Sequence, residues 1–152
     1  MNKGKIFIIK MIVSFFFLGY LSFLPGTITS FICLFFVWFL RGSFLFYLSL
    51  LFLTIILGFI TTTKAEKIFN KKDCQKIVID EAAGVFLSFL LVPLDLKSLS
   101  AGFIIFRILD AVKIFPAYFL ERLSGAKGIM FDDLVAGIYT NIILQVVFRF
   151  LT

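Results

Sequence analysis

Charged side chains are crowded into the stretch FRILDAVK, residues 106–113, within a segment that otherwise has the composition of a membrane helix. Arg107, Asp110 and Lys113 fall within two helical turns, and Arg107 and Asp110, three residues apart, share one helix face. A charge near the centre of a bilayer costs roughly 2.5–3.5 kcal/mol on insertion scales. Three such residues together therefore indicate either water close by or a chemical role.

Two further pairs of acids stand at the start of apolar segments: Asp80 with Glu81, and Asp132 with Asp133. Together with Asp110, they would bring carboxylates from three helices to one side of the molecule. Mg²⁺ takes oxygen ligands and is usually held by one or two carboxylates together with substrate phosphate. The pattern predicts a Mg²⁺ site built from these five acids, which would also carry out the catalysis.

The neighbouring cations fit the same interpretation, because Arg107 and Lys113 are suited to binding phosphate oxygens. A water activated by the metal or by a carboxylate would attack phosphorus, and the cations would neutralise the developing charge. A site at headgroup depth makes a lipid phosphate the predicted substrate class. Two questions stay open: which acid binds metal and which activates water, and whether an aspartyl-phosphate forms.

Two alternatives compete with this hypothesis. In the first, the acids are structural: both pairs would be stabilised by the macrodipole at a helix N-terminus, and Arg107 with Asp110 would be a plain ion pair. In the second, the acids form the cation path of a small transporter. A transporter would spread its charges through the depth of the membrane, whereas these charges are predicted at one face.

The stretch LPGTITS, residues 24–30, gives a weaker signal. Pro25 and Gly26 predict a turn, after which Thr27 and the next hydroxyl residues open a helix. Because a helix N-terminus with hydroxyls can bind phosphate, Thr27 is a candidate phosphate ligand. An ordinary N-cap explains the same residues equally well.

The composition predicts a protein covered by lipid. Of 152 residues, 61% are hydrophobic and 23 are Phe, more apolar surface than a soluble domain of this size can bury. The net charge of +6 is modest, so we predict contact with anionic headgroups and no nucleic-acid partner. The absence of histidine excludes mechanisms with an imidazole base. Cys33 and Cys74 make a poor metal site and a poor disulfide.

The apolar segments predict a single all-α domain over residues 1–152, a polytopic membrane helical bundle. Residues 28–40 would span only about 20 Å as a helix, against ~30 Å of hydrocarbon. We therefore expect short or re-entrant N-terminal helices, with the catalytic residues at the cytoplasmic helix ends. The basic and apolar start is similar to a signal peptide but no small-residue cleavage site follows, so we expect it to remain in the mature chain.

The distribution of positive charge predicts the orientation. If residues 61–81 and 107–133 lie on one side together with the N-terminus, that side holds twelve of the 15 Lys and Arg residues. The other side holds three: Arg41, Lys97 and Arg149. By the positive-inside rule the crowded side is cytoplasmic. This arrangement requires that residues 1–26 enter and return, or lie along the interface, rather than cross once.

Three motifs, taken in order, resemble the phosphatidylglycerophosphatase A family: IDEAAG, FRILDAVKIFP and GIMFDDLVAG. The earlier LPGTITS is similar to the family's N-terminal Pro-Gly-Thr segment. By this resemblance Asp80 and Glu81 match the family's Asp-Glu pair. The remaining matches are to its Arg, Asp and Lys and to its paired aspartates: Arg107, Asp110, Lys113, Asp132 and Asp133.

The resemblance implies a Mg²⁺-dependent phosphatase of the bacterial inner membrane, with its active site facing the cytoplasm. Its substrate would be phosphatidylglycerophosphate, whose terminal phosphate is removed to give phosphatidylglycerol. A lipid phosphatase of broader range, acting also on phosphatidic acid, stays open as the second enzymatic interpretation. The spaced Asp-Gly, Ala-Arg and Asp signature of CDP-alcohol phosphotransferases is absent, which argues against a transferase. No oligomeric state is predicted.

Overall fold

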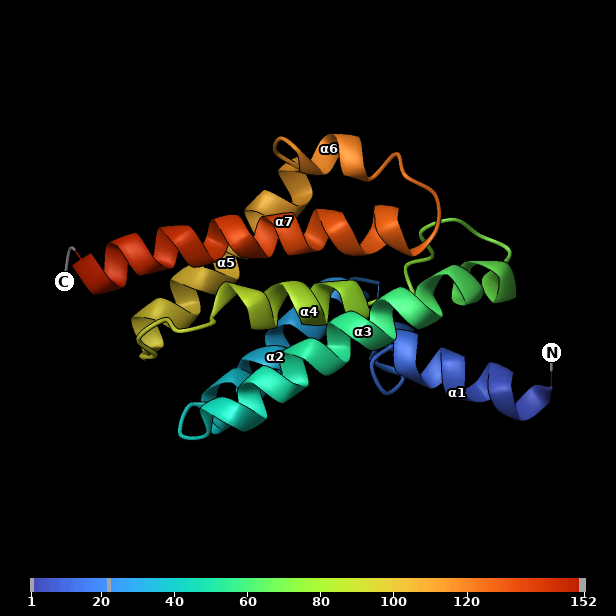
Figure 1. Cartoon of the computed structure of the whole chain (residues 1–152), viewed down its shortest axis with the longest axis horizontal. Coiled ribbons are helices and arrows are strands. Elements are labelled where there is room, and N and C mark those ends of the chain that lie inside the picture. Colours follow the sequence, from blue (N-terminus) through green and yellow to red (C-terminus); the bar gives the residue numbers. More distant parts are fainter. Residues whose placement is uncertain (1, 22, 151–152) are drawn as a thin grey trace.

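The computed structural model describes residues 2–21 and 23–150, without the side chains of 149 and 150, and this part of the chain is helical throughout apart from turns and loops (Figure 1). The all-α prediction is therefore confirmed. The helices, in order, are α1 (Lys3–Val13), the 3-10 turn η1 (Leu18–Tyr20), α2 (Pro25–Leu40), α3 (Phe44–Phe69), α4 (Ile79–Ser88), α5 (Leu96–Val112), α6 (Ala117–Leu120), α7 (Ala126–Gln145) and the π-helical turn η2 (Val146–Phe150).

Within the described residues, two helical stretches, Phe44–Phe69 (α3) and Ala126–Phe148 (α7 and most of η2), are long and apolar enough to cross a membrane. Only 28% and 33% of their apolar windows are buried within the protein, whereas the core helix of a soluble protein would be mostly buried. Large side chains on their outer faces are exposed, among them Phe46, Ile56 and Ile142. Exposed apolar surface of this extent is typical of a protein covered by lipid.

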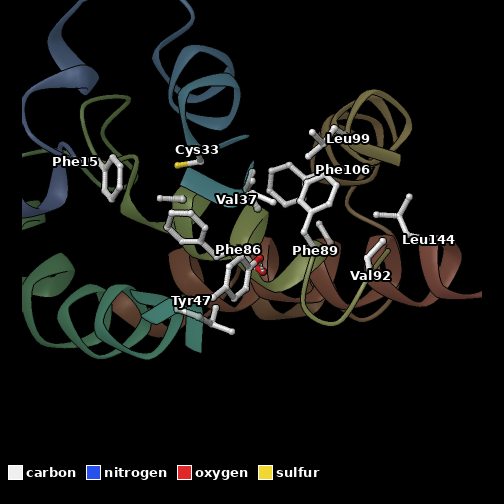
Figure 2. Packing of buried hydrophobic residues seen from close by; sticks show 14 of the residues in the cluster. Phe15, Cys33, Val37, Tyr47, Phe86, Phe89, Val92, Leu99, Phe106 and Leu144 are labelled. Carbon is white, nitrogen blue, oxygen red and sulfur yellow. Dashed lines mark hydrogen bonds between the residues drawn. The ribbon is translucent and has the colours of Figure 1, made fainter. Parts of the chain in front are cut away.

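The N-terminal helix α2 is short, as the sequence predicts, and the central helix α4 is shorter still. α2 has 16 residues and α4 has 10, which correspond to about 24 Å and about 15 Å. α4 lies at the centre of the bundle and packs against α2, α3, α5 and α7. It is buried on nearly all sides, and around it lies an apolar core that includes Phe86, Phe89 and Phe106 (Figure 2).

The loops sort onto two ends of the bundle (Figure 1). We call the end formed by α1, residues 70–78 and residues 113–125 the basic end. The opposite end holds the connections 41–43 and 89–95. The lysines of α1 and of the loop after α3 belong to the basic end. Arg41 directly follows α2 and Lys97 lies in the first turn of α5, so both belong to the opposite end, as the positive-charge distribution predicts.

The N-terminal segment stays at the basic end. α1 packs against α3, and the Val78 N–H donates to the Val13 carbonyl oxygen at 2.8 Å. The ammonium of Lys10 lies 5.6 Å from the centre of the Phe69 ring, at the C-terminal end of α3. With only 11 residues, α1 is about 16 Å long and too short to cross a bilayer. The expectation that residues 1–26 do not cross once therefore agrees with the fold.

Small residues allow α4 and α7 to pack closely. A Cβ on Gly137 would lie 2.6 Å from the Gly84 carbonyl oxygen, and a Cβ on Gly84 would lie 2.8 Å from the Asp133 carbonyl oxygen. On α5, a Cβ on Gly102 would meet the Phe89 ring at 2.5 Å. These three glycines therefore allow close helix packing, as small residues do in membrane bundles.

Two expected helix starts are wrong. α7 begins at Ala126, so Asp132 and Asp133 lie inside the helix and its first turn contains no acid. The reason is the Thr63 hydroxyl, which accepts the Ala126 N–H at 2.9 Å, after Gly125 has turned the chain at φ 70°. α2 begins at Pro25, within the turn predicted before it, so Thr27 is not its N-cap.

Candidate metal and phosphate site

Three helices bring the predicted acids together beside the basic end. Asp80 and Glu81 occupy the first turn of α4, and Asp110 lies in the last turn of α5. Asp132 and Asp133 come from the interior of α7, where the close crossing of Gly84 and Gly137 draws α7 against α4. The favourable effect of a helix N-terminus on acids therefore applies to α4 and does not explain the α7 pair.

The tightest group is formed by Asp80, Glu81 and Asp133, which we call the three-carboxylate cluster. One carboxylate oxygen from each residue lies within 4.8 Å of the other two. Asp80 is 7% exposed and Asp133 is 4% exposed. Three carboxylates at this spacing repel one another, and burial removes the water that would screen them.

The cluster has oxygens without hydrogen-bond partners. Among the described residues, the buried oxygens Asp80 Oδ1, Glu81 Oε2 and Asp133 Oδ2 accept no hydrogen bond. Buried polar atoms in native proteins are almost always paired, so three unpaired carboxylate oxygens from one cluster are suited to binding a ligand. Because all three donors are carboxylate oxygens, the ligand they fit is a hard divalent cation such as Mg²⁺.

The raised pKa values of the two acids on α4 agree with this interpretation. Burial raises the pKa of Glu81 to about 7, with Asp110 contributing and the contacts to Asp80 and Arg107 partly opposing. Burial also raises the pKa of Asp80, and the neighbouring Glu81 carboxylate adds to the effect. Both side chains therefore take up a proton more readily than an exposed carboxyl does, and a bound cation would compete with that proton.

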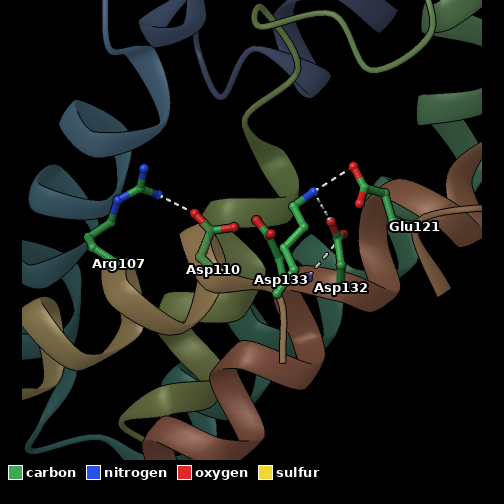
Figure 3. Close-up of polar contacts among 6 residues, drawn as sticks. Arg107, Asp110, Glu121, Asp132 and Asp133 are labelled. Carbon is green, nitrogen blue, oxygen red and sulfur yellow. Dashed lines mark hydrogen bonds and ion pairs between the residues drawn. The ribbon is translucent and has the colours of Figure 1, made fainter. Parts of the chain in front are cut away.

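The two remaining acids are each paired with a cation (Figure 3). Arg107 Nη1 lies 2.7 Å from Asp110 Oδ2, and Lys113 Nζ lies 2.9 Å from Asp132 Oδ2. Figure 3 shows the carboxylates of Asp110, Asp133 and Asp132 in a row, with Arg107 at one end. The five acids predicted from the sequence thus divide into a three-carboxylate cluster and two flanking ion pairs.

Lys113 owes its position to an unusual backbone conformation. It is the residue that ends α5, with φ 50° and ψ 62°, a left-handed conformation that is uncommon for residues with a side chain. Its ammonium also contacts Glu121 at 2.9 Å. Burial alone would lower the pKa of Lys113, but Glu121 and Asp132 outweigh it and raise the pKa, so the side chain stays charged.

Thr27 lies at a small cavity of about 170 Å³ that is also lined by Gly26, Gln75, Glu81 and Arg107. The cavity therefore joins the N-terminal turn of α2 to a member of the three-carboxylate cluster and to one of the two predicted phosphate-binding cations. Its size suits a small polar group. Thr27 is placed where a phosphate ligand could reach it, in the third position of α2.

Sequence reasoning missed two participants. Glu121 gives no signal in the sequence, because it directly follows the short helix α6 and contacts Lys113 where that residue ends α5 in a left-handed conformation. Gly26 was assigned to a turn, whereas the Glu81 carboxylate occupies the space that a Cβ at Gly26 would fill. The only hint of this role in the sequence was the Pro25-Gly26 pair, which we interpreted as a turn.

A family model and two curated relatives indicate the same family. The family model described as phosphatidylglycerophosphatase A matches residues 11–148. Curated proteins named phosphatidylglycerophosphatase A from Escherichia coli (strain K12) and from Haemophilus influenzae (strain ATCC 51907 / DSM 11121 / KW20 / Rd) are each 37% identical over 94 residues. The alignments cover 60% of this chain in both cases, and 55% and 58% of those two proteins.

A third relative carries a different name. A Bacteroides thetaiotaomicron protein, provisionally named a phosphatidylinositol-3-phosphatase, is 34% identical over 92 residues, which cover 59% of this chain and 57% of that protein. The chain thus spans a little over half the length of the curated relatives that it matches. No solved structure matches the chain.

Proposed function

Because this chain belongs to the phosphatidylglycerophosphatase A family, as the match over residues 11–148 establishes, we propose that it is a Mg²⁺-dependent phosphatase of phosphatidylglycerophosphate. It would release the terminal phosphate and leave phosphatidylglycerol. The single observation that carries the proposal is the three-carboxylate cluster, with its unpaired buried oxygens, placed between two cations suited to phosphate.

Asp80, Glu81 and Asp133 would hold the cation. When bound, Mg²⁺ would neutralise charge on the transferring phosphoryl group and stabilise the transition state. The carboxylates are already in place, and their displaced protons would leave as the metal binds. Asp110 and Asp132 are better suited to other roles, because each is engaged by a cation in the metal-free protein.

Arg107 and Lys113 would bind the phosphate oxygens. Each forms an ion pair at 2.7–2.9 Å, and both side chains are about one quarter exposed, so a phosphate can reach them. Arg107 and Thr27 line the same cavity as Glu81, which would place the phosphate beside the metal ligands. An incoming phosphate would thus replace Asp110 as the partner of Arg107 and Asp132 as the partner of Lys113. Both cations can form strong charge-assisted hydrogen bonds to phosphate oxygens.

The release of Arg107 would free Asp110 to act as the base. Water would attack phosphorus as the ester O–P bond breaks, and Asp110 would accept the proton that the water loses. The leaving glycerol oxygen would take a proton from solvent at the open side of the cavity. Lys113 would stabilise the charge that develops on the phosphoryl oxygens.

Membrane location supports a lipid substrate. The two long apolar helices and the exposed aromatic surface support insertion, and the charge separation between the ends supports placing the basic end at the cytoplasmic face of the bacterial inner membrane. The site would then lie at the depth of lipid headgroups. A transporter is less well supported, because its acids should be spread along the membrane depth rather than gathered near one end.

A broader lipid phosphatase is the second candidate, favoured by the third relative, whose name assigns it a phosphoinositide substrate. The test is phosphate release by the purified protein from phosphatidylglycerophosphate, phosphatidic acid and phosphatidylinositol 3-phosphate, each with Mg²⁺ and with excess EDTA. Mg²⁺-dependent release from the first lipid alone supports the proposal. Comparable release from all three supports the broader enzyme, and no release from any contradicts both.

A further inference from the structure

An apolar groove of about 550 Å³ runs along the seam between α2 and α5. It is lined by four α2 residues between Phe31 and Trp38 and by five α5 residues between Leu96 and Ile104. Every lining side chain except Ser100 is aliphatic or aromatic, and none carries a charge. The groove is therefore suited to hydrocarbon.

The groove leads to the proposed phosphate cavity. Phe31 and Phe103 face each other across the seam, with ring centroids 6.1 Å apart. Thr27 lies four residues before Phe31 on α2, and Arg107 lies four residues after Phe103 on α5, so both are one turn nearer the basic end. Thr27 and Arg107 line the smaller cavity together with Glu81. The polar cavity and the apolar groove are thus successive parts of the same seam.

The length of the seam matches one leaflet. From Thr27 to Trp38 the α2 backbone rises by ~16 Å, and half of the ~30 Å hydrocarbon core is ~15 Å. α2 runs from the cavity toward the opposite end of the bundle, and α5 returns in the other direction (Figure 1). A chain attached to a phosphate in the cavity would therefore extend along the groove toward the middle of the membrane.

We propose that the α2–α5 groove binds one acyl chain of the lipid whose phosphate occupies the cavity beside Glu81 and Arg107. This inference rests on the proposed function, and it adds the part of the substrate that the protein recognises besides the phosphate. A phosphate monoester without a long acyl chain reaches the same catalytic groups but leaves the groove empty. The groove therefore makes the protein selective for lipid-borne phosphate over soluble phosphate esters.

A kinetic test uses two matched serines. Ser100 lines the groove, Ser49 lies on the exposed face of α3, and each hydroxyl donates to the carbonyl four residues earlier at 2.8 Å. Ser100→Trp fills the groove, and we expect it to lower kcat/KM for dioleoyl phosphatidylglycerophosphate by roughly tenfold or more. It should leave turnover of water-soluble glycerophosphoglycerophosphate unchanged, and Ser49→Trp should change neither. Equal losses on both substrates, or an equal effect of Ser49→Trp, would overturn the proposal.

A binding test does not depend on turnover. Phosphatidylglycerophosphate with a photoreactive diazirine near the end of one acyl chain is mixed with the wild-type protein in phosphatidylcholine vesicles with excess EDTA, and labelled residues are mapped by mass spectrometry. We expect labels between Phe31 and Trp38 and between Leu96 and Ile104, removed by unlabelled phosphatidylglycerophosphate but not by more phosphatidylcholine. Labels spread over all lipid-facing helices, or equal competition by phosphatidylcholine, would overturn the acyl-chain site.

The two tests separate the failure of this inference from the failure of the proposed function. Specific labelling of the groove in a protein that releases no phosphate supports the acyl-chain site and overturns the phosphatase. Phosphate release combined with unspecific labelling supports the phosphatase and overturns the acyl-chain site.

Discussion

The carboxylate of Glu81 on α4 lies against Gly26 on α2, in the space that any larger residue would need for its Cβ. A glycine in the first turn of one helix therefore allows a metal-binding candidate on another helix to reach its position. Since the atom that a Cβ at position 26 would meet is the end of the flexible Glu81 side chain, a clash there would move the Glu81 carboxylate rather than the backbone.

Gly26→Ala should thus impair the site more than the fold. We expect phosphate release to fall by roughly 10- to 100-fold, since a misplacement of about 1 Å has effects of this size. The thermal unfolding temperature should change little. Gly42→Ala is the control, because a Cβ at Gly42 meets nothing within 4 Å. Full activity of Gly26→Ala would show that the position of Glu81 does not matter for turnover.

Gly137→Ala should, in contrast, destabilise the fold. Its Cβ would lie 2.6 Å from the Gly84 carbonyl oxygen, and backbone cannot move aside as a side chain can. Forcing the α4–α7 crossing apart should destabilise the protein by roughly 1–3 kcal/mol. Gly58→Ala is the comparison, because the three atoms nearest to its Cβ would all belong to the flexible Met130 side chain. Thermal unfolding in detergent should rank Gly137→Ala clearly below Gly58→Ala, and the reverse order would contradict the packing.

Binding of Mg²⁺ should strengthen as the pH rises through about 7. Burial raises the pKa of Glu81 from its ordinary 4.5 to about 7, so below that pH the side chain is protonated and the cation must displace the proton. The sign for stability follows from the same shift: as the pH rises from about 4.5 to 7, this group lowers the stability of the metal-free protein, and bound Mg²⁺ restores it.

Calorimetric titration with Mg²⁺ checks this, since heats measured in buffers of different ionisation enthalpy give the number of protons released. We expect proton release near pH 6 that decreases by pH 8, and Glu81→Gln should weaken binding and abolish much of the release. An Mg²⁺ affinity that does not change between pH 6 and 8 would contradict the assignment of Glu81.

Lys113 and Glu121 should differ in their importance although they form one ion pair. The Glu121 side chain is 43% exposed, and exposed pairs contribute only about 0–1 kcal/mol to stability. We expect Glu121→Gln to change kcat/KM by less than roughly threefold, whereas Lys113→Gln loses a phosphate contact and should cost roughly 100-fold. Steady-state kinetics on the lipid substrate decide this, and an equally large loss in Glu121→Gln would place Glu121 in the catalytic machinery.

The sequence was sufficient for the features that depend on local patterns. The helical class, the short early helices and the gathering of acids all follow from composition and spacing. The charge counts predicted that the N-terminal segment would stay at the basic end, and α1 lies there.

Features that depend on contacts distant in sequence were not predicted. α7 begins at Ala126 because the Ala126 N–H donates to the Thr63 hydroxyl on another helix. The local sequence around Ala126 does not indicate that hydrogen bond. The division of the five acids also depends on how α4, α5 and α7 cross, since Asp132 and Asp133 are neighbours in sequence but have different partners. Asp132 contacts Lys113, whereas Asp133 joins Asp80 and Glu81.

The central claim is that the cluster of Asp80, Glu81 and Asp133 binds the cation needed to hydrolyse a lipid phosphate. The most direct test is phosphate release from phosphatidylglycerophosphate by the wild-type protein and by Asp133→Asn, Asp110→Asn and Asp132→Asn, with Mg²⁺ and with excess EDTA. Lys97→Ala, at the opposite end of the bundle, is the control. The account predicts Mg²⁺-dependent release by the wild type and by Lys97→Ala, and its loss in the three folded aspartate variants. Near-normal release by Asp133→Asn, or release by the wild type that is unaffected by EDTA, would contradict it.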